Sequence, residues 1–399
     1  MTMHLRPALA FSLFTALCLP STGFAQDVPP AAAALLKSWE IQYKMAPTYK
    51  SISTDSNGAV TIENLEWKVA PGTDPSVKAT VDSVELEDIA DEGSGLYSIG
   101  DVTYTGMKID FAGVDGTSFS ISTPEVAIED MYVKAVGDNP SPADTLRAGM
   151  NVAKKSAWGK ITVNAGGQSV SADGLTTTWD GDPVTGSGKS NMKLSNIFIP
   201  ETLMAMADQS GMIKGLGYST LSIDIGADID LTNDGKNLAM NFGTYYAVKD
   251  VGTLHVGADV ADISMALVAA AQTMKPGADA SALLPQAQSM SFGNFKIRFE
   301  DSSITNKVLP LIAQMQGTDA QTLKGSASAF AQIGLAQLKS PNFTQQVVTA
   351  INAYLADPKS VTVTMKPAKR ITIGELMTLN PQDPAAIIAL LGVGISAND

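Results

Sequence analysis

The fold class follows most directly from residues 221–235, which read LSIDIGADIDLTNDG. Apolar and polar side chains alternate through this segment: Leu221, Ile223, Ile225, Ile229 and Leu231 are separated by Ser222, Asp224, Gly226, Asp228, Asp230 and Thr232. A period of two is typical of a β-strand with one apolar and one polar face. The sequence Asn233-Asp234-Gly235 then predicts a tight hairpin turn, because asparagine and glycine tolerate the left-handed backbone that such turns require.

The same alternation continues on both sides of this hairpin. The return strand carries Leu238, Met240 and Phe242 on one face, and a third strand carries Leu254, Val256, Ala258 and Val260. Between residues 49 and 136, short alternating segments are separated by turn clusters, whereas residues 263–357 are mostly helical in period, apart from a strand at 292–300. We therefore expect an α+β fold that is mainly antiparallel sheet with meanders and hairpins, and whose helices are concentrated in the C-terminal third.

Individual elements can also be predicted. A helix is expected at 31–45, ended by Pro47, and another at 144–157. Residues 318–321 and 342–345 have the form of capping boxes, and the helix that follows 342 should bury Phe343, Val347, Ile351, Tyr354 and Leu355. A strand pair at 361–365 and 371–373, a helix at 384–391 and a short segment at 393–395 close the chain.

Residues 1–25 have the layout of a secretory signal peptide. His4 and Arg6 precede an apolar run of twelve residues, and small residues before Gln26 predict cleavage between Ala25 and Gln26. The run is shorter than the roughly twenty residues of a membrane-spanning helix. Cys18 follows a leucine rather than a small residue, which argues against a lipoprotein anchor. We expect an exported, periplasmic protein with no transmembrane segment in its mature chain.

The predicted mature chain has few of the side chains on which enzymes depend. It would contain 374 residues, no cysteine, one histidine, and 26 basic against 40 acidic residues, a net charge of −14. Such a charge repels nucleic acid, and the densest basic spots are only Lys154-Lys155 and residues 366–370. A chain of this length suggests two or three domains. The order of helical and alternating segments along the chain predicts the signal peptide at 1–25, a helix with a β-rich domain at 26–143, a β-meander domain at 144–300, and a mixed helical domain at 301–399 that packs on the sheet.

Candidate binding motifs are weak. Residues 186–190 (GSGKS) resemble the end of a phosphate-binding loop, but Pro183 stands where that motif needs its first glycine, and a strand pattern follows instead of a helix. His255 falls on the polar side of its strand, four residues before Asp259, and is expected to be a surface histidine. No catalytic, cofactor-binding or metal-binding residue is therefore predicted, and no cofactor.

Acidic residues give two further candidates. Asp224, Asp228, Asp230 and Asp234 are spread along one strand and its turn, rather than gathered in the glycine-centred loop that holds calcium, so they indicate a solvated face. The segment 173–182 is expected to be a loop and is a slightly better candidate for an ion or a sugar ring. With 40 acidic residues, a pair of carboxylates suited to glycoside hydrolysis stays possible, but no pair is singled out.

Residues 295–399 carry a resemblance to a known family. The order is a strand, the segment FEDSSITNKVLPLIAQMQG, two further helices, LADPKSVTVTMKPAKRITIGELM, and a short helix with GVGISAND. This order is similar to the C-terminal portion of YdgA-like and, more distantly, AsmA-like envelope proteins of Gram-negative bacteria. The resemblance implies a curved sheet whose apolar face holds or conducts lipid, or supports outer-membrane assembly. It provides no catalytic motif, and many of those proteins begin with a membrane-spanning helix rather than a cleavable signal.

These observations favour a non-enzymatic, exported protein of the cell envelope whose partners are lipid or other envelope proteins. An exported hydrolase that works through carboxylates and a surface structural module are the alternatives, and the oligomeric state is left open. The question that separates them is whether the apolar face of the 218–262 meander is open or covered. We expect the helices of residues 305–356 to cover it completely, because buried sheet faces are common.

The signal peptide can be tested directly. We expect the protein purified from the periplasmic fraction to begin at Gln26, because signal peptidase cuts after small residues at the −3 and −1 positions. The intact mass and N-terminal sequence check this. A chain that keeps residues 1–25, or that fractionates with the cytoplasm, would contradict export.

Overall fold

The computed structural model describes residues 28–68, 76–112, 118–137, 140–274 and 279–399. The predicted signal peptide and its cleavage site at Ala25 and Gln26 lie outside these residues. The fold class is α+β and mainly antiparallel, as predicted, with the helices mostly in the C-terminal half of the chain.

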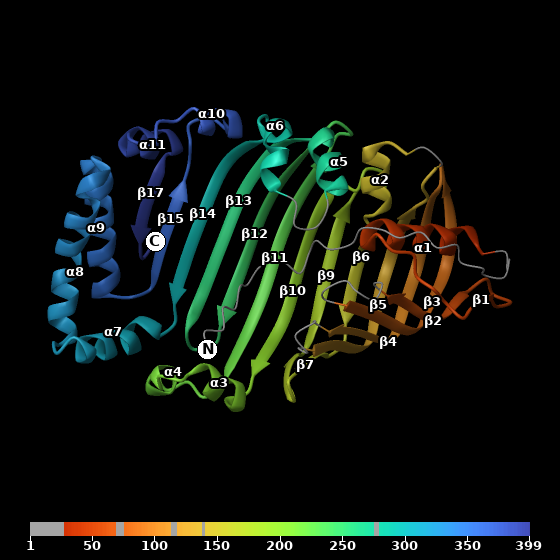
Figure 1. The fold of residues 1–399 in the computed structure, drawn as a ribbon, viewed down its shortest axis with the longest axis horizontal. Helices are drawn as coiled ribbons and strands as arrows, with labels where there is room; N and C mark the ends of the chain where they lie inside the picture. The colour runs from red at the N-terminus through yellow and green to blue at the C-terminus, as the bar shows by residue number, and fades with distance from the viewer. Residues whose placement is uncertain (1–27, 69–75, 113–117, 138–139, 275–278) are drawn as a thin grey trace.

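Within the described residues, seventeen strands form one sheet. The strands are β1 (Ser51–Thr54), β2 (Val60–Lys68), β3 (Ser76–Gly93), β4 (Leu96–Ala112), β5 (Ser118–Lys134), β6 (Val152–Trp158), β7 (Ile161–Ala165), β8 (Gln168–Ala172), β9 (Gly174–Gly181), β10 (Gly188–Ile199), β11 (Leu221–Asn233), β12 (Asn237–Val248), β13 (Gly252–Ser264), β14 (Ser291–Asp301), β15 (Ser360–Met365), β16 (Ile371–Thr372) and β17 (Val393–Ala397). Every pairing is antiparallel, and the sheet runs from β1 at one edge to β17 at the other (Figure 1).

Most of the helices stand at the borders of this sheet, whereas α1 lies on its face over β2–β5. They are α1 (Pro30–Tyr43), α2 (Pro142–Ala148), α3 (Glu201–Ala207), α4 (Met212–Gly215), α5 (Met265–Thr273), α6 (Leu284–Ala287), α7 (Ile304–Met315), α8 (Ala320–Leu335), α9 (Pro341–Ala356), α10 (Ile373–Met377) and α11 (Pro384–Leu391), with short 3₁₀ turns at Ala280–Leu283 and Ala336–Leu338. In Figure 1, α5 and α6 lie at one end of the central strands and α3 and α4 at the other, while α7, α8 and α9 lie beside β15 and β17.

The register of the strands places one apolar row across almost the whole sheet. Residues paired across antiparallel strands point to the same face. The row is Ile52, Ile62, Val84, Tyr104, Val126, Trp158, Leu175, Leu194, Ile225, Tyr246, Leu254, Phe299, Val361 and Ala397. These residues come from fourteen strands, and none of them is charged or carries an amide. The sheet therefore has one continuous apolar face.

The buried core lies at the β1 end of this face. Leu35 and Trp39 of α1 pack against β2–β5, where Ile62 and Val84 are fully buried. The Trp39 ring meets the edge of Trp67 at a centroid distance of 5.4 Å, a geometry that aromatic pairs favour. Here α1 gives the apolar row a cover of its own.

A bulge in β10 keeps the row on one face. The pairing with β11 shifts by one residue between Leu194 and Ile197, and Asn196 within this bulge has a left-handed backbone with φ of 50°. Leu194 and Ile197 are three residues apart, so in a regular strand they would point to opposite faces, because side chains alternate along a strand. Asparagine tolerates this conformation better than most residues, and the bulge lets both apolar side chains stay on the same side.

Several local predictions need correction. Of the helix predicted at 144–157, only residues 144–148 are helical, because Gly149 ends α2 and Val152–Trp158 forms strand β6. The predicted loop at 173–182 is mostly strand β9. Helix α8 is capped by Asp319, one residue later than expected, and α9 begins at Pro341 after Ser340, so Asn342 is not its cap. The apolar stripe predicted for α9 is half-buried rather than fully buried.

Two further predictions concern strand pairing and domain boundaries. The segments at 361–365 and 371–373 do not pair with each other, because β15 and β16 both pair with β14. The sheet continues without a break through the predicted domain boundaries at 143/144 and 300/301, where β5 pairs with β6 and β14 with β15. The division into three domains stays a prediction.

The difference between the covered and uncovered parts of the row can be measured. We expect Leu35→Ala to lower the free energy of unfolding by about 2–5 kcal/mol, because it leaves a cavity in a closed core. Leu254→Ala should cost about 1 kcal/mol or less, because substitutions at partly exposed sites disturb little packing. Urea denaturation followed by tryptophan fluorescence compares the two. Equal losses would mean that Leu254 is as well covered as Leu35.

Candidate functional site

The apolar face is open over the middle of the sheet. We define the open apolar face as the apolar-side residues of β10–β14, whose main members are Met192, Leu194, Ile225, Ile229, Phe242, Tyr246, Leu254, Val256, Phe295, Ile297 and Phe299. Each of these side chains is half-buried or exposed, and Tyr246, Ile229 and Leu254 have exposed fractions of 42%, 38% and 37%. In contrast, Ile62 and Val84 of the same row are 0% exposed under α1.

No described helix crosses the middle of β10–β14 in Figure 1. The expectation that residues 305–356 cover the meander is therefore wrong for the described residues. The physical reason lies at the sheet edge, where α9 packs beside β17. The amide of Asn398 donates to the carbonyl oxygens of Ala353 and Asp357 at 2.9 Å each, which joins the end of α9 to the edge strand. These helices protect an edge that would otherwise offer unpaired main-chain groups.

The open apolar face has the chemistry of a hydrocarbon surface. The main-chain groups of β10–β14 are used in the strand ladders, so only side chains reach the surface. The polar interruptions in its rows are hydroxyls such as Ser190 and Thr244. Five strands spaced by about 4.8 Å extend about 20 Å across the sheet. Large exposed apolar patches are rare on monomeric proteins, and where they occur they commonly mark a binding site.

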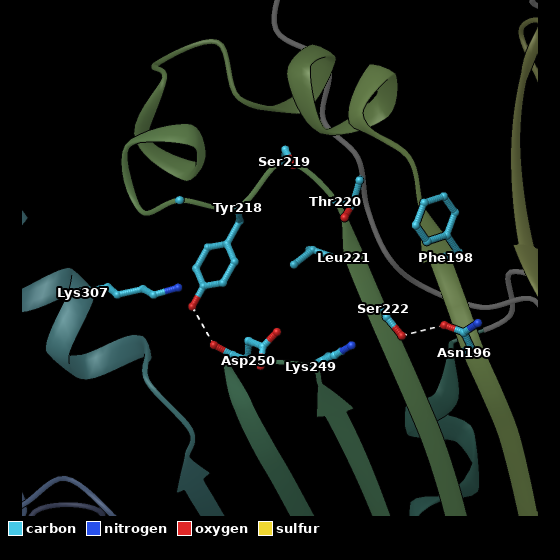
Figure 2. Close-up of a pocket in the computed structure, with 11 residues that line it drawn as sticks. Asn196, Phe198, Tyr218, Ser219, Thr220, Leu221, Ser222, Lys249, Asp250 and Lys307 are labelled. Carbon is cyan, nitrogen blue, oxygen red and sulfur yellow. Dashed lines mark hydrogen bonds between the residues drawn. The ribbon is translucent and has the colours of Figure 1, made fainter.

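A pocket of about 530 Å³ lies where β10, β11 and β12 end, which we call the rim pocket (Figure 2). The loop from α4 to β11 supplies Tyr218, Ser219 and Thr220; the other main lining residues are Phe198 of β10, Leu221 of β11, Lys249 and Asp250 of the turn after β12, and Lys307 of α7. Segments far apart in the sequence therefore form this site, which no sequence motif indicated.

Hydrogen bonds hold the walls of the rim pocket in place. The Tyr218 hydroxyl donates to the carbonyl oxygen of Asp250 at 2.8 Å, and the Ser303 hydroxyl donates to the same oxygen at 2.5 Å. The Lys307 ammonium lies 3.8 Å from the centroid of the Tyr218 ring, a cation–π contact. On the opposite wall, the Ser222 hydroxyl donates to the Asn196 side-chain oxygen at 2.6 Å. These contacts restrain the residues that surround Lys249 and Lys307.

His255 lies on the polar face, as predicted. It pairs with Tyr245 on one side and Arg298 on the other, and its Nε2 is 3.5 Å from Glu300 Oε2. A shallow pocket of about 350 Å³ surrounds it. Asp259 is not its partner, because Arg370 holds that carboxylate through Nη1 at 2.7 and 2.8 Å. Nothing in this arrangement resembles a nucleophile activated by a base.

The four aspartates of the β11 hairpin do not converge. Asp224 accepts from the Asn196 amide at 2.7 Å, Asp228 accepts from the Asn191 side chain at 2.7 Å, and Asp230 lies 3.9 Å from the Lys189 ammonium. Asp234 instead caps the turn by accepting from the amides of Lys236 and Asn237. Across the described ranges, no group of three or more potential metal ligands comes together.

The two basic spots and the GSGKS string have structural roles. Lys154 and Lys155 pair with Asp130 and Glu129 on the neighbouring strand β5, and Lys369 pairs with Glu375. Gly188, Lys189 and Ser190 begin strand β10 rather than a helix, so the phosphate-loop geometry is absent there. These residues form no free basic patch.

Arg298 organises the acids beside His255. Its Nε donates to Glu300 at 2.8 Å, and its Nη1 donates to Asp399 at 2.5 Å and to Thr362 at 2.9 Å. The hydrogen bond from Arg298 is the largest cause that lowers the pKa of Glu300 below its usual value. Hydrogen bonds from Ser396, and then from Arg298 and Thr362, lower the pKa of Asp399 to about 2.

This network predicts a pH dependence. A carboxyl group whose pKa is lowered by folding stabilises the fold above its unfolded pKa, and that stabilisation is lost as the pH falls through its folded pKa. We therefore expect Arg298→Met to lower the free energy of unfolding at pH 7, and the deficit to shrink as the pH falls from about 4.5 toward 2. Urea denaturation at pH 7, 4.5 and 3 measures it, with Lys193→Met as the control. A deficit that does not change with pH would contradict the role of the two acids.

The comparisons with known proteins add little to this geometry. Residues 245–398 match a protein family that is described only as "Uncharacterized protein". The match begins within β12 and extends past β17, so it includes Leu254, Phe299 and Lys307 but not β10 or β11. No curated protein matches the chain. Along the described part of the chain, no helix combines the length and the apolar character needed to cross a bilayer. Residues 245–398 are thus similar to a family whose description names no activity.

Proposed function

We propose that this protein is an exported, non-enzymatic protein of the cell envelope that binds the acyl chains of lipids on the open apolar face. The observation that supports this proposal most strongly is the exposure of Tyr246, Ile229 and Leu254 on one continuous apolar surface. Transfer of each methylene group from water to such a surface contributes up to about 0.8 kcal/mol. A long acyl chain therefore gains affinity in proportion to the length that it buries.

Acyl chains suit this surface better than a protein partner does. Protein interfaces combine an apolar centre with a polar rim that supplies about one hydrogen bond per 100–200 Å². Between its ends the open apolar face presents only occasional hydroxyls, such as Ser190 and Thr244, and its main-chain groups are already paired. At the ends of β11 and β14, Asn233 donates to the carbonyl oxygen of Thr185, and Asp301 accepts from the Tyr354 hydroxyl. A hydrocarbon chain needs no hydrogen-bond partner, so the lack of charged and amide groups between the ends of this face costs it nothing.

Two features of the sequence support a place in the envelope. The predicted signal peptide would deliver the mature chain to the periplasm, an aqueous compartment between two lipid bilayers. The resemblance of residues 295–399 to YdgA-like and AsmA-like proteins implies a curved sheet that holds or conducts lipid. A lipid that moves through this compartment needs its chains shielded from water, which an open apolar sheet provides.

The hydrolase alternative has less support. Glu300 and Asp228 line the pocket around His255, but the hydrogen bond from Arg298 keeps the pKa of Glu300 low. A carboxyl that is ionised at neutral pH cannot donate a proton to a leaving group, and glycoside hydrolysis requires one acid whose pKa is raised. A surface structural module would need no open apolar face and is therefore the weaker alternative.

Two substitutions on opposite faces of β13 test lipid binding. We expect mature protein to release phospholipid on solvent extraction and to bind a fluorescently labelled phospholipid. Leu254→Lys should weaken that binding about tenfold or more, because a buried ammonium next to hydrocarbon is costly. Thr253→Lys is the matched control, because it adds the same charge to the same strand on the polar face, opposite Glu300.

Mass spectrometry of the extract and fluorescence titration measure the two effects, and circular dichroism checks the fold of each variant. If no lipid copurifies and no labelled phospholipid binds, the proposal fails. If both variants bind as well as the wild type, the site is not the open apolar face.

A further inference from the structure

We propose that the rim pocket binds the phosphate group of a lipid whose acyl chains lie on the open apolar face. This inference rests on the proposed function and names the headgroup chemistry that goes with it. The pocket would take a phosphodiester headgroup, which carries a single negative charge. Three features of the rim pocket support this inference: its charge, its free hydrogen-bond donors and its position at the end of β11.

The pocket contains two ammonium groups that make no ion pair with the described residues. Lys307 is half-buried and contacts the Tyr218 ring, and Lys249 is exposed at the turn after β12. Other lysines, such as Lys193 and Lys296, also make no ion pair with a described residue, but they lie on the exposed surface of the sheet, whereas Lys307 is half-buried beside a cavity. A half-buried lysine that faces a cavity, without an acid beside it, favours an anion in that cavity.

The charge of the pocket matches one phosphodiester. Asp250 is the only acidic residue among those that line it, so the lining carries two positive charges and one negative charge. Figure 2 shows Lys249 and Lys307 on two sides of the cavity, with Tyr218 and Leu221 between them. The net charge of +1 balances a phosphodiester of charge −1, and hydrogen bonds from ammonium groups to phosphate oxygens are among the stronger ones in proteins.

Further donors are available on the loop that enters β11. The hydroxyls and main-chain amides of Ser219 and Thr220 have no hydrogen-bond partner among the described residues, although both residues line the pocket. Phosphate oxygens accept several hydrogen bonds at once, and main-chain amides in loops often supply them. The hydrogen bond from Tyr218 to Asp250 restrains this loop at the residue that precedes Ser219.

The pocket reaches the apolar side of the sheet at Leu221, whereas Phe198 and Ser222, which pair with each other, line it from the polar side. Leu221 lines the pocket and also pairs with Ile199 on the apolar side of β11, in line with Ile223 and Ile225. From Leu221 to Leu231, the strand extends about 34 Å at about 3.4 Å per residue. One leaflet of a bilayer core is about 15 Å thick. A lipid with its phosphate in the pocket therefore has room for its full acyl chains along β11.

The test compares two lipids that differ only in the phosphoglycerol headgroup. Mature protein and the double variant Lys249→Gln with Lys307→Gln are titrated with a labelled phosphatidylglycerol and with the matching labelled diacylglycerol. We expect the wild type to bind the phospholipid about tenfold or more tightly than the diacylglycerol, and the double variant to lose that preference while it still binds diacylglycerol. The control double variant, Lys160→Gln with Lys193→Gln, changes the net charge equally and should keep the preference.

Each outcome has a distinct meaning. Equal binding of both lipids by the wild type would overturn the headgroup site but leave acyl-chain binding intact. Failure of the wild type to bind either lipid would contradict the proposed function itself. Inorganic phosphate is the third arm: if it binds to the wild type and not to the double variant, while neither lipid binds, the pocket is a site for free phosphate and the lipid inference is wrong.

Discussion

Antiparallel pairing keeps one row of apolar side chains on the same face from Ile52 in β1 to Ala397 in β17. A shift of one residue in any pairing would turn the next strand over and expose its polar side to the core. The bulge at Asn196 shows how strictly this condition is met, because it absorbs an extra residue so that Leu194 and Ile197 stay together. Both the closed core under α1 and the open apolar face depend on this register.

The apolar row is buried at one end of the sheet and exposed in the middle, because the helices are unevenly placed. Helix α1 closes the face over β2–β5, where Leu35 and Trp39 bury Ile62 and Val84. The larger helices of the C-terminal part stand beside β17 instead, where they guard an edge. A sheet of this length has only two edges, and the other edge strand, β1, is only four residues long. Helices placed at borders leave hydrocarbon-like surface over β10–β14, and this surface supports a role in lipid binding.

The charged side chains of the strands lie mainly on one face of the sheet. On the polar face, several charges pair with neighbours on the same or the next strand, as with Lys155 and Glu129 or Arg298 and Glu300. Lys249 and Lys307 also make no ion pair with a described residue, and both line the rim pocket at the end of the sheet. Apolar surface and unpaired cations next to each other match the two parts of a phospholipid, and this match connects the open apolar face with the rim pocket.

Much of this architecture could be read from local patterns. The alternation in 221–235 correctly predicted strand β11, its hairpin and the side on which Ile225 and Asp228 lie, because the direction of a side chain in a strand depends only on its position along the chain. The same rule placed His255 on the polar face. It could not tell whether Leu254 is buried, since burial depends on what lies above the sheet, and α9 packs beside it. Nor could it find the rim pocket, because Asn196, Lys249 and Lys307 are brought together only when three distant segments meet at one end of the strands.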